Sequence, residues 1–291
     1  MFRRLRLFGM LFARTIDKCA RDNTSFLAGS ISFYSMLSLA PALWIVIAIL
    51  GALIGQQSAR GAVLDWVGQN VGVLGAGYVG TIIDQVNESS RLATIGGAFA
   101  MFLGATAAFA ALRNSLARIW NLPDAEVTGF WAQLRDFVRN FFTTRLLGFL
   151  VMLISGFLLI CSLIAGVVLS FMERYMPAYL PAPELFLEAA HFLTSSILMM
   201  LMFATVYHLL HRQSFVRGEI WVGASVTAFL FALGSAIISP YLGRSGTSSA
   251  YGAAGAFVLI LLWIYYSVQI FLFGAAFTEV YSRYVKKPSE F

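Results

Sequence analysis

Long runs of apolar residues, separated by short clusters of charge, dominate the pattern of this chain. The stretch from Ser245 to Thr278 holds 34 residues without Asp, Glu, Lys or Arg. A helix rises about 1.5 Å per residue, so about 20 apolar residues cross a hydrocarbon core of about 30 Å. We therefore predict a transmembrane helix over 248–278, with small residues at its start and aromatic residues after them.

The same reasoning predicts five further spans, and thus an all-α polytopic membrane protein with six transmembrane helices. The first, 29–54, contains Pro41, which removes a backbone donor and favours a kink. The second, 92–112, carries a ridge of small residues through Gly104, which favours close packing against span one or the start of span six. The remaining spans are predicted at 146–172, 189–211 and 220–243.

One further segment, Trp66 to Ile83, is uncharged and 18 residues long, so it competes as a span. Its five glycines, with Gln69 and Asn70, disfavour both helix formation and insertion. We assign it to an outside segment, because an additional span would reverse every later loop. Earlier in the chain, Gly51 and Gly55 form a GxxxG pair suited to close helix packing.

Two amphipathic stretches lie outside the predicted spans. Residues 2–22, within an N-terminal segment 1–28, place apolar side chains three or four positions apart and arginines mostly off that stripe. This pattern predicts a helix at the membrane interface, with an ordinary packing helix as an equal alternative. Residues 120–145 predict a second interfacial helix, and 281–291 form a basic tail. The apolar stripe of the first helix consists of Leu5, Phe8, Phe12 and Ile16.

Composition supports the membrane assignment, and charge gives the orientation. The chain is 59% hydrophobic and 12% charged, against about 25% charged in a typical soluble domain. Sixteen of its 20 Lys and Arg residues lie in alternate segments, which places both termini in the cytoplasm. These segments are 1–28, 113–145, 212–219 and 279–291, whereas 55–91, 173–188 and 243–251 together hold four.

The sequence shows no pattern typical of an enzyme. It has no Walker A, G-x-S-x-G or H-E-x-x-H motif. His208 and His211 share a helix face, but a metal site needs three or four converging ligands, so we expect interfacial histidines. Cys19 and Cys161 are far apart and indicate neither a disulfide framework nor a zinc site. We therefore expect no catalytic residue, cofactor, metal or nucleic-acid partner.

Three segments carry recognisable motifs. Residues 31–41 read ISFYSMLSLAP, with an FY-x-x-x-S-x-x-P pattern; 104–120 read GATAAFAALRNSLARIW; and 251–277 hold a YG…W-x-Y pattern. Together they resemble the YihY/virulence factor BrkB family of bacterial inner-membrane proteins, formerly called ribonuclease BN, over about residues 15–285. The resemblance implies a six-span helical fold with cytoplasmic termini, and transport, including lipid translocation, is the role inferred for the family.

Two positions depart from the family pattern. The family often has Glu after the Gly-Ala of span six, where this chain has Ala276, and the nearest acid is Glu279. The family often has Pro closing span four, where this chain has His211. If the family's glutamate carries ions or anchors a partner, this chain must use Glu279 or do without it.

The function favoured by these patterns is a transporter or lipid translocator without its own ATPase, in contact with membrane lipids. A non-transporting membrane scaffold or envelope-integrity factor is the alternative, a nuclease is disfavoured, and a homo-oligomer stays open. Glu279 also fits a plain i,i+4 pair with Arg283, and Gln269 a hydrogen bond to a neighbouring helix. The candidate substrate-path or packing residues are Tyr34, Pro41, Gly104, Arg113, Asn114, Tyr251, Gly252, Gln269 and Glu279.

Overall fold

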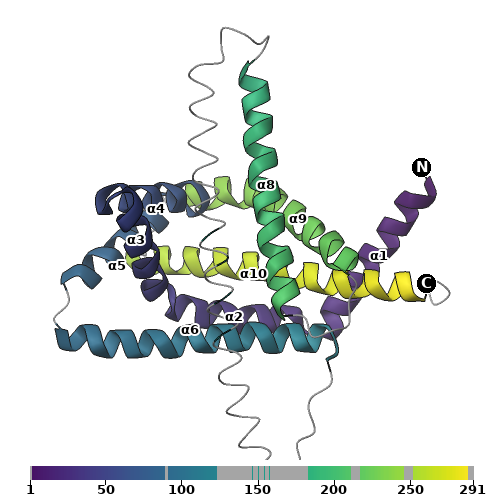
Figure 1. Ribbon diagram of the computed structural model, residues 1–291, viewed down its shortest axis with the longest axis horizontal. Helices are drawn as coiled ribbons and strands as arrows, with labels where there is room; N and C mark the ends of the chain where they lie inside the picture. The colour runs from purple at the N-terminus through teal and green to yellow at the C-terminus, as the bar shows by residue number, and fades with distance from the viewer. Residues whose placement is uncertain are drawn as a thin grey trace, which may run out of the picture. The chain divides into compact units, whose positions relative to one another are not determined.

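The computed structural model describes residues 2–88, 91–122, 183–210, 217–245 and 252–287, with single positions at 146, 150, 154 and 157. Within these ranges every regular element is an α-helix, which confirms the predicted all-α class (Figure 1). The helices are α1 (Phe2–Arg21), α2 (Thr24–Leu37), α3 (Leu39–Ile54), α4 (Gln56–Val71), α5 (Val73–Glu88), α6 (Arg91–Ile119), α8 (Pro183–Leu210), α9 (Arg217–Ser245) and α10 (Gly252–Lys286).

Three of the described helices are long and apolar enough to cross a membrane, and they coincide with predicted spans four, five and six. The qualifying stretches are Phe192–Leu210 in α8, Gly218–Ile238 in α9 and Gly255–Lys286 in α10. Large apolar side chains on these helices are exposed, among them Phe229 at 64%, as expected for a surface that faces lipid. The total of six spans stays a prediction. Nearly all of span three, 146–172, and of the predicted helix at 120–145 lies outside the described residues.

Predicted span one, 29–54, falls on two helices. Helix α2 ends at Leu37 and α3 begins at Leu39, with Ser38 between them at φ −90° and ψ 0°. Pro41 explains the break, because it has no N–H to donate to the carbonyl of Leu37, four residues earlier. The two helices have 14 and 16 residues, and each is shorter than the roughly 20 residues that a bilayer core requires.

Two glycines with positive φ divide the next stretch into short helices. Gly55, at φ 88°, joins α3 to α4, and Gly72, at φ 93°, joins α4 to α5. Glycine adopts this backbone region without the steric cost that a side chain brings. A Cβ on Gly51 would lie 3.2 Å from Cγ of Gln56, so Gly51 makes room for the chain to reverse. The interpretation of Gly51 and Gly55 as a helix-packing pair is therefore wrong: they serve the turn.

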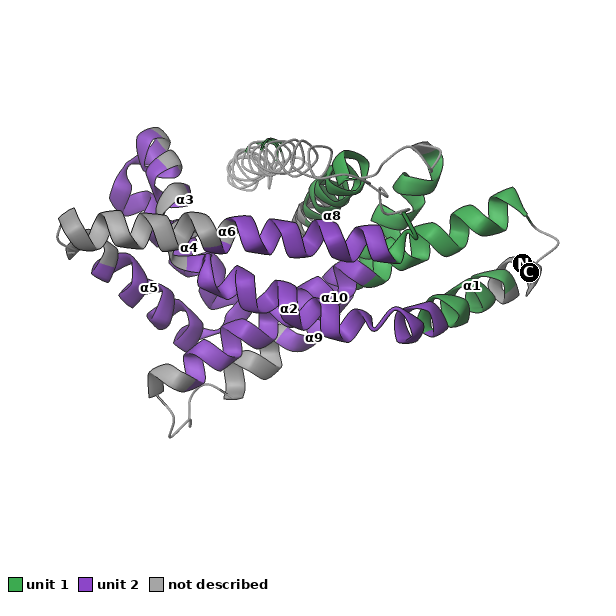
Figure 2. Cartoon of the chain, turned by 90° about the horizontal axis from the view of Figure 1, so that it is seen from below, with its two compact units in different colours: residues 1–16, 119–230, 273–291 green, residues 17–118, 231–272 purple. Residues whose placement is uncertain are grey.

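The chain forms two compact units (Figure 2). Unit 1 contains residues 1–16, 119–230 and 273–291, and unit 2 contains 17–118 and 231–272. Helices α1, α6, α9 and α10 therefore each contribute residues to both units. The segments of one unit are far apart in the chain, so each unit depends on contacts between distant parts of the sequence.

The core of unit 2 lies where α4 and α5 pack against α2, α3 and α10. Partly buried side chains of α3 and α10 surround it, including Leu43, Ile47 and Ile264. The small-residue ridge of α6 packs against α2 at Gly104, where an added Cβ would lie 3.5 Å from Cβ of Leu37. Span one, rather than span six, is therefore the neighbour of the ridge at this position. The buried core residues are Met36, Val67, Val71, Val79, Ile83 and Ile260.

The core of unit 1 joins α1 to the end of α10. Leu11 is 1% exposed and clusters with Phe277 and Val280. The predicted apolar stripe is only partly covered, since Phe8 and Ile16 remain about half exposed. The buried face of α1 runs through Leu11, and the stripe residues Phe8 and Phe12 meet the rings of Phe277 and Phe273 at 6.0 and 5.0 Å, which favours the packing alternative for this helix. The exposed apolar residues still suit contact with lipid.

Five buried hydroxyl groups are satisfied within their own helices. Thr15, Ser32, Ser115, Thr227 and Thr278 each donate to the carbonyl four residues earlier, at 2.6–2.8 Å. All five side chains are buried. This local bonding removes most of the cost of placing a hydroxyl in an apolar environment.

Candidate functional site

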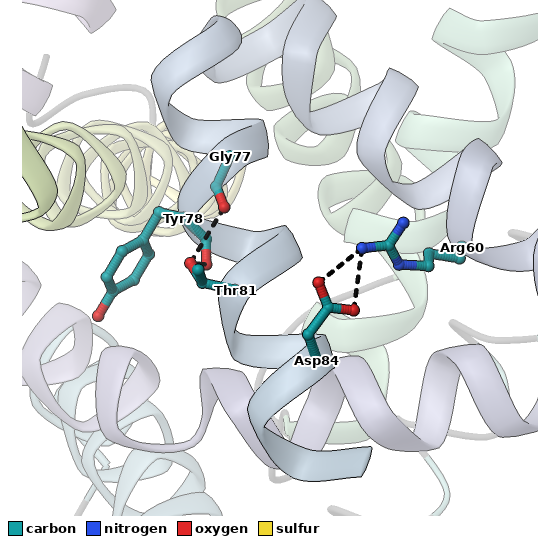
Figure 3. Close-up of polar contacts among 5 residues, drawn as sticks. All are labelled: Arg60, Gly77, Tyr78, Thr81 and Asp84. Atoms are coloured by element: carbon teal, nitrogen blue, oxygen red, sulfur yellow. Dashed lines mark hydrogen bonds and ion pairs between the residues drawn. The ribbon is translucent and has the colours of Figure 1, made fainter. Parts of the chain in front are cut away.

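Helices α4 and α5 form a hairpin whose open end is joined by an ion pair (Figure 3). Nη2 of Arg60 donates to both carboxylate oxygens of Asp84, at 2.9 and 2.8 Å. Thr81, one turn before Asp84, donates to the carbonyls of Gly77 and Tyr78 at 3.0 and 2.8 Å. The side chains of the pair are 39% and 56% exposed, so the pair contributes at most about 1 kcal/mol.

The hairpin packs against the first part of α10. The ring of Trp66 meets that of Trp263 edge-on at 5.5 Å, and Tyr78 meets Phe257 edge-on at 6.4 Å. Both α10 residues lie within the stretch Gly255–Lys286 that is apolar enough to cross a membrane. The short helices and their glycine turn therefore lie beside a spanning helix, a position that the assignment of 66–83 to an outside segment did not anticipate.

Three polar side chains of this part of α10 hold buried atoms without a hydrogen-bond partner among the described residues. These atoms are Nε1 of Trp263, the hydroxyl of Tyr266 and Oε1 of Gln269. The Tyr266 hydroxyl lies against the backbone of Gly234, where a Cβ would overlap it. Gln269 uses its other polar atom, since Nε2 donates to Oγ1 of Thr24 on α2 at 3.4 Å, a long bond. The expected bond from Gln269 to a neighbouring helix is thus present.

In unit 1, helices α9 and α10 approach more closely than side chains would permit. A Cβ on Gly223 would overlap Oγ1 of Thr278, and a Cβ on Gly274 would overlap Oγ1 of Thr227. Tyr207 of α8 completes the contact, because its hydroxyl lies 3.0 Å from Oγ1 of Thr227. None of these five residues is among the candidate residues predicted from the sequence, and only Gly274 lies within a motif segment, 251–277.

Trp120, just beyond α6, fixes the same contact from another side. Its Nε1 donates to the carbonyl of Ala275 at 3.1 Å, and its ring meets that of Tyr207 at 6.1 Å. Trp120 ends the second family-like segment, and Ala275 belongs to the third, so these two motifs meet in the fold.

The acidic candidate Glu279 is buried, at 6% exposure, and pairs with Arg283. The i,i+4 ion pair expected from the sequence is thus present, and its carboxylate lies inside the protein. Ala276, which stands where the family often has Glu, is fully buried. A second acid, Glu219 of α9, is buried at 3% exposure and was not anticipated. Its place in the first turn of α9 is favourable for a negative charge.

The other candidates are dispersed along the fold. Tyr34 is on α2, 37% exposed, with its ring 5.6 Å from that of Phe33. Arg113 and Asn114 are on α6, the first partly buried and the second exposed. Pro41 is the third residue of α3, Gly252 begins α10, and Tyr251 lies outside the described residues.

Among the described residues, no group of three His, Cys, Asp or Glu side chains is placed to hold a metal ion. His208 is exposed on α8, and His211 lies outside the described ranges. The polar groups in the first part of α10 belong to the neutral residues Trp263, Tyr266 and Gln269. At the hairpin, the polar groups include the ion pair Arg60–Asp84.

These features define the chain as a membrane protein whose described parts are helical, with interrupted helices among them. Residues 15–290 match the virulence factor BrkB family. The chain belongs to this family, which confirms the resemblance found in its motifs.

Several curated relatives extend over nearly the whole chain. The chain is 24% identical over 270 residues to a UPF0761 membrane protein of Alteromonas mediterranea, covering 92% of this chain and 86% of the relative. A UPF0761 membrane protein of Pseudoalteromonas atlantica is 22% identical over 284 residues, with 94% and 87% covered. One of Ralstonia nicotianae is 25% identical over 268 residues, with 89% and 56% covered. No solved structure matches.

Proposed function

We propose that this protein is a non-enzymatic transporter of the bacterial inner membrane, which moves a neutral polar or amphipathic substrate, such as a lipid, without an ATPase of its own. The observation that carries the proposal is the series of short helices α3, α4 and α5, joined at Gly55 and Gly72 and packed on α10. Interrupted helices at membrane depth are tolerated where they are buried in protein or line a cavity, and they are typical of substrate sites in transporters.

The polar atoms of α10 support the proposal. Trp263, Tyr266 and Gln269 present an N–H donor, a hydroxyl and an amide oxygen in an apolar helix. Leaving such groups unpaired costs about 1–3 kcal/mol each, so water or a substrate group is expected to bind them. Residues 252–278 contain no charged side chain, and an uncharged site suits hydroxyl and amide groups better than a free ion.

Reconstitution into liposomes tests this proposal. Purified protein would be assayed with NBD-labelled phosphatidylethanolamine, by dithionite quenching, and with glycerol and xylitol, by swelling. We expect flux above protein-free liposomes for at least one substrate. Tyr266→Phe and Gln269→Leu should each lower it several-fold, whereas the matched Tyr265→Phe should leave it unchanged. Absence of flux for every probe would refute transport, and equal effects of Tyr265→Phe and Tyr266→Phe would refute the role of the α10 groups.

We also propose that both termini lie in the cytoplasm. The charge distribution supports this orientation, because sixteen of 20 Lys and Arg residues fall in the segments assigned to that side. A fluorescent protein that matures only in the cytoplasm, fused after Lys287, should be bright. A periplasmic phosphatase fused at the same place should be inactive, and the opposite pair of results would refute the orientation.

A further inference from the structure

We infer that the α4–α5 hairpin is a re-entrant membrane element, which enters the bilayer and returns to the side from which it came. The inference concerns the depth of this hairpin and the acyl chains around its turn, and it does not depend on transport. Residues 67–77, around Gly72, are called the hairpin tip, and the residues from the Arg60–Asp84 pair outward are called its base.

The ion pair shows which residues of the two arms lie at the same level. Arg60 and Asp84 are in direct contact, and each is 12 positions from Gly72. Equal lengths of helix therefore separate the pair from the turn on either arm. By the same spacing, Trp66 and Tyr78, each six positions from Gly72, lie at one level.

Charged and aromatic residues divide the hairpin at this level. Trp66 and Tyr78 are the residue types that gather at membrane–water boundaries. The tip holds no charge, and its only polar side chains are two neutral amides, Gln69 and Asn70. Six residues on each arm extend beyond the aromatic level, so the tip reaches roughly 9 Å into the bilayer. All charged residues of the hairpin, namely Arg60, Asp65, Asp84 and Glu88, lie on the base side of Trp66 and Tyr78, and Asp65 is next to Trp66.

The contacts with α10 place the hairpin beside a membrane-spanning stretch, independently of the hairpin's own sequence. Trp66 and Tyr78 pack on Trp263 and Phe257, which lie near the start of the stretch Gly255–Lys286. A hairpin that packs against this membrane-spanning stretch is itself surrounded by the bilayer. At the tip, Val73 is 79% exposed, and lipid acyl chains are the partner that an exposed valine beside a spanning helix fits.

The lengths and the backbone of the hairpin exclude a full crossing. Each arm has 16 residues, about 24 Å, which is shorter than a hydrocarbon core of about 30 Å. Backbone that leaves a helix at membrane depth must keep its polar groups bonded or covered by protein. Gly72 is buried, and its N–H donates to the carbonyl of Gly68 at 3.1 Å.

Single cysteines in the full-length protein test the inference. The chain's own Cys19 and Cys161 would first be replaced by serine. Ser58→Cys and Gln85→Cys then report on the two arms of the base, through a membrane-impermeant maleimide added to either face of the membrane. Val73→Cys, labelled with the dye NBD, reports on the tip through quenching by doxyl-labelled lipids and by aqueous iodide. Leu262→Cys on α10 and Asp17→Cys on α1 serve as lipid and water references.

The inference predicts that both base cysteines are labelled from the same face. It also predicts that NBD at position 73 is quenched by doxyl lipids at least half as strongly as NBD at position 262, and by iodide several-fold less than NBD at position 17. Base cysteines labelled from opposite faces would mean a complete crossing and overturn the inference. Iodide quenching at position 73 equal to that at position 17 would place the tip in water and overturn it as well.

Discussion

Gly223 and Thr278 make one of the closest contacts between α9 and α10, and alanine at position 223 tests its importance. A Cβ there would overlap Oγ1 of Thr278 and lie 2.9 Å from its Cβ and 3.4 Å from the carbonyl oxygen of Gly274. Thr278 is fully buried and its hydroxyl donates to that carbonyl at 2.8 Å. The added methyl group must therefore separate the helices or break this hydrogen bond.

The size of the effect follows from these two consequences. Overpacking a well-packed site costs about 1–3 kcal/mol, and losing one buried hydrogen bond costs about 1 kcal/mol more. The higher helix propensity of alanine offsets up to about 1 kcal/mol. The expected loss in the free energy of unfolding for Gly223→Ala is therefore about 1–3 kcal/mol. In a chain of this size, it lowers the Tm by roughly 3–10 °C.

Thermal unfolding in detergent, followed by intrinsic tryptophan fluorescence, measures this loss. Gly218→Ala is the matched control, because it is on the same helix and a Cβ there meets nothing within 4 Å. The double variant Gly223→Ala/Thr278→Gly exchanges the small and large residues and should recover at least half of the loss. If Gly223→Ala unfolds at the same temperature as Gly218→Ala, or if the double variant is no better than the single one, the argument from close contact fails.

Three further predictions concern other parts of the fold. Gly72→Ala places a side chain at φ 93° and ψ 171°, a region that is essentially restricted to glycine, and should cost about 1–3 kcal/mol. The loss is measured as the Tm relative to that of Gly77→Ala, where a Cβ meets open space; equal Tm values would contradict the turn. Gly104→Ala should be tolerated, because its Cβ would lie 3.5 Å from that of Leu37, whereas Gly104→Leu should lower the Tm; a stable leucine variant would mean that the ridge faces lipid. Burial raises the pKa of the Cys19 thiol, so the rate of its alkylation by iodoacetamide should still rise with pH above the range in which an ordinary thiol levels off; a rate that levels off at the same pH as for a free thiol would contradict this.

The long helices were predictable because their signal is local. A run of apolar residues specifies a spanning helix wherever it packs, so the stretches 192–210, 218–238 and 255–286 were found, with ends that differ from the predicted ones by one to eight residues. The break before Pro41 was also predictable, because proline has no N–H to donate to the carbonyl four residues earlier. Its position at Ser38 rather than at the proline follows from that spacing.

The candidate site depends on backbone dihedral angles and on the register between helices, and a single sequence shows neither. Gly55 and Gly72 adopt positive φ, but nothing in the sequence distinguishes them from the other glycines of this glycine-rich segment. Whether Gly223 lies against Thr278 depends on the register of two helices more than 50 residues apart. Apolar patterning sets which face of a helix is buried, but it does not set the height at which two helices meet.

Hydroxyl groups that donate to carbonyls of their own helix affect how the protein inserts into the membrane. Thr227 and Thr278 are buried between helices, yet each donates to a carbonyl of its own helix, at 2.7 and 2.8 Å. Such a residue does not need a neighbour when its segment leaves the translocon, so α9 and α10 can each partition into lipid alone and associate afterwards. Biogenesis can therefore proceed one segment at a time, and the order in which the ribosome delivers them need not match the order in which they dock.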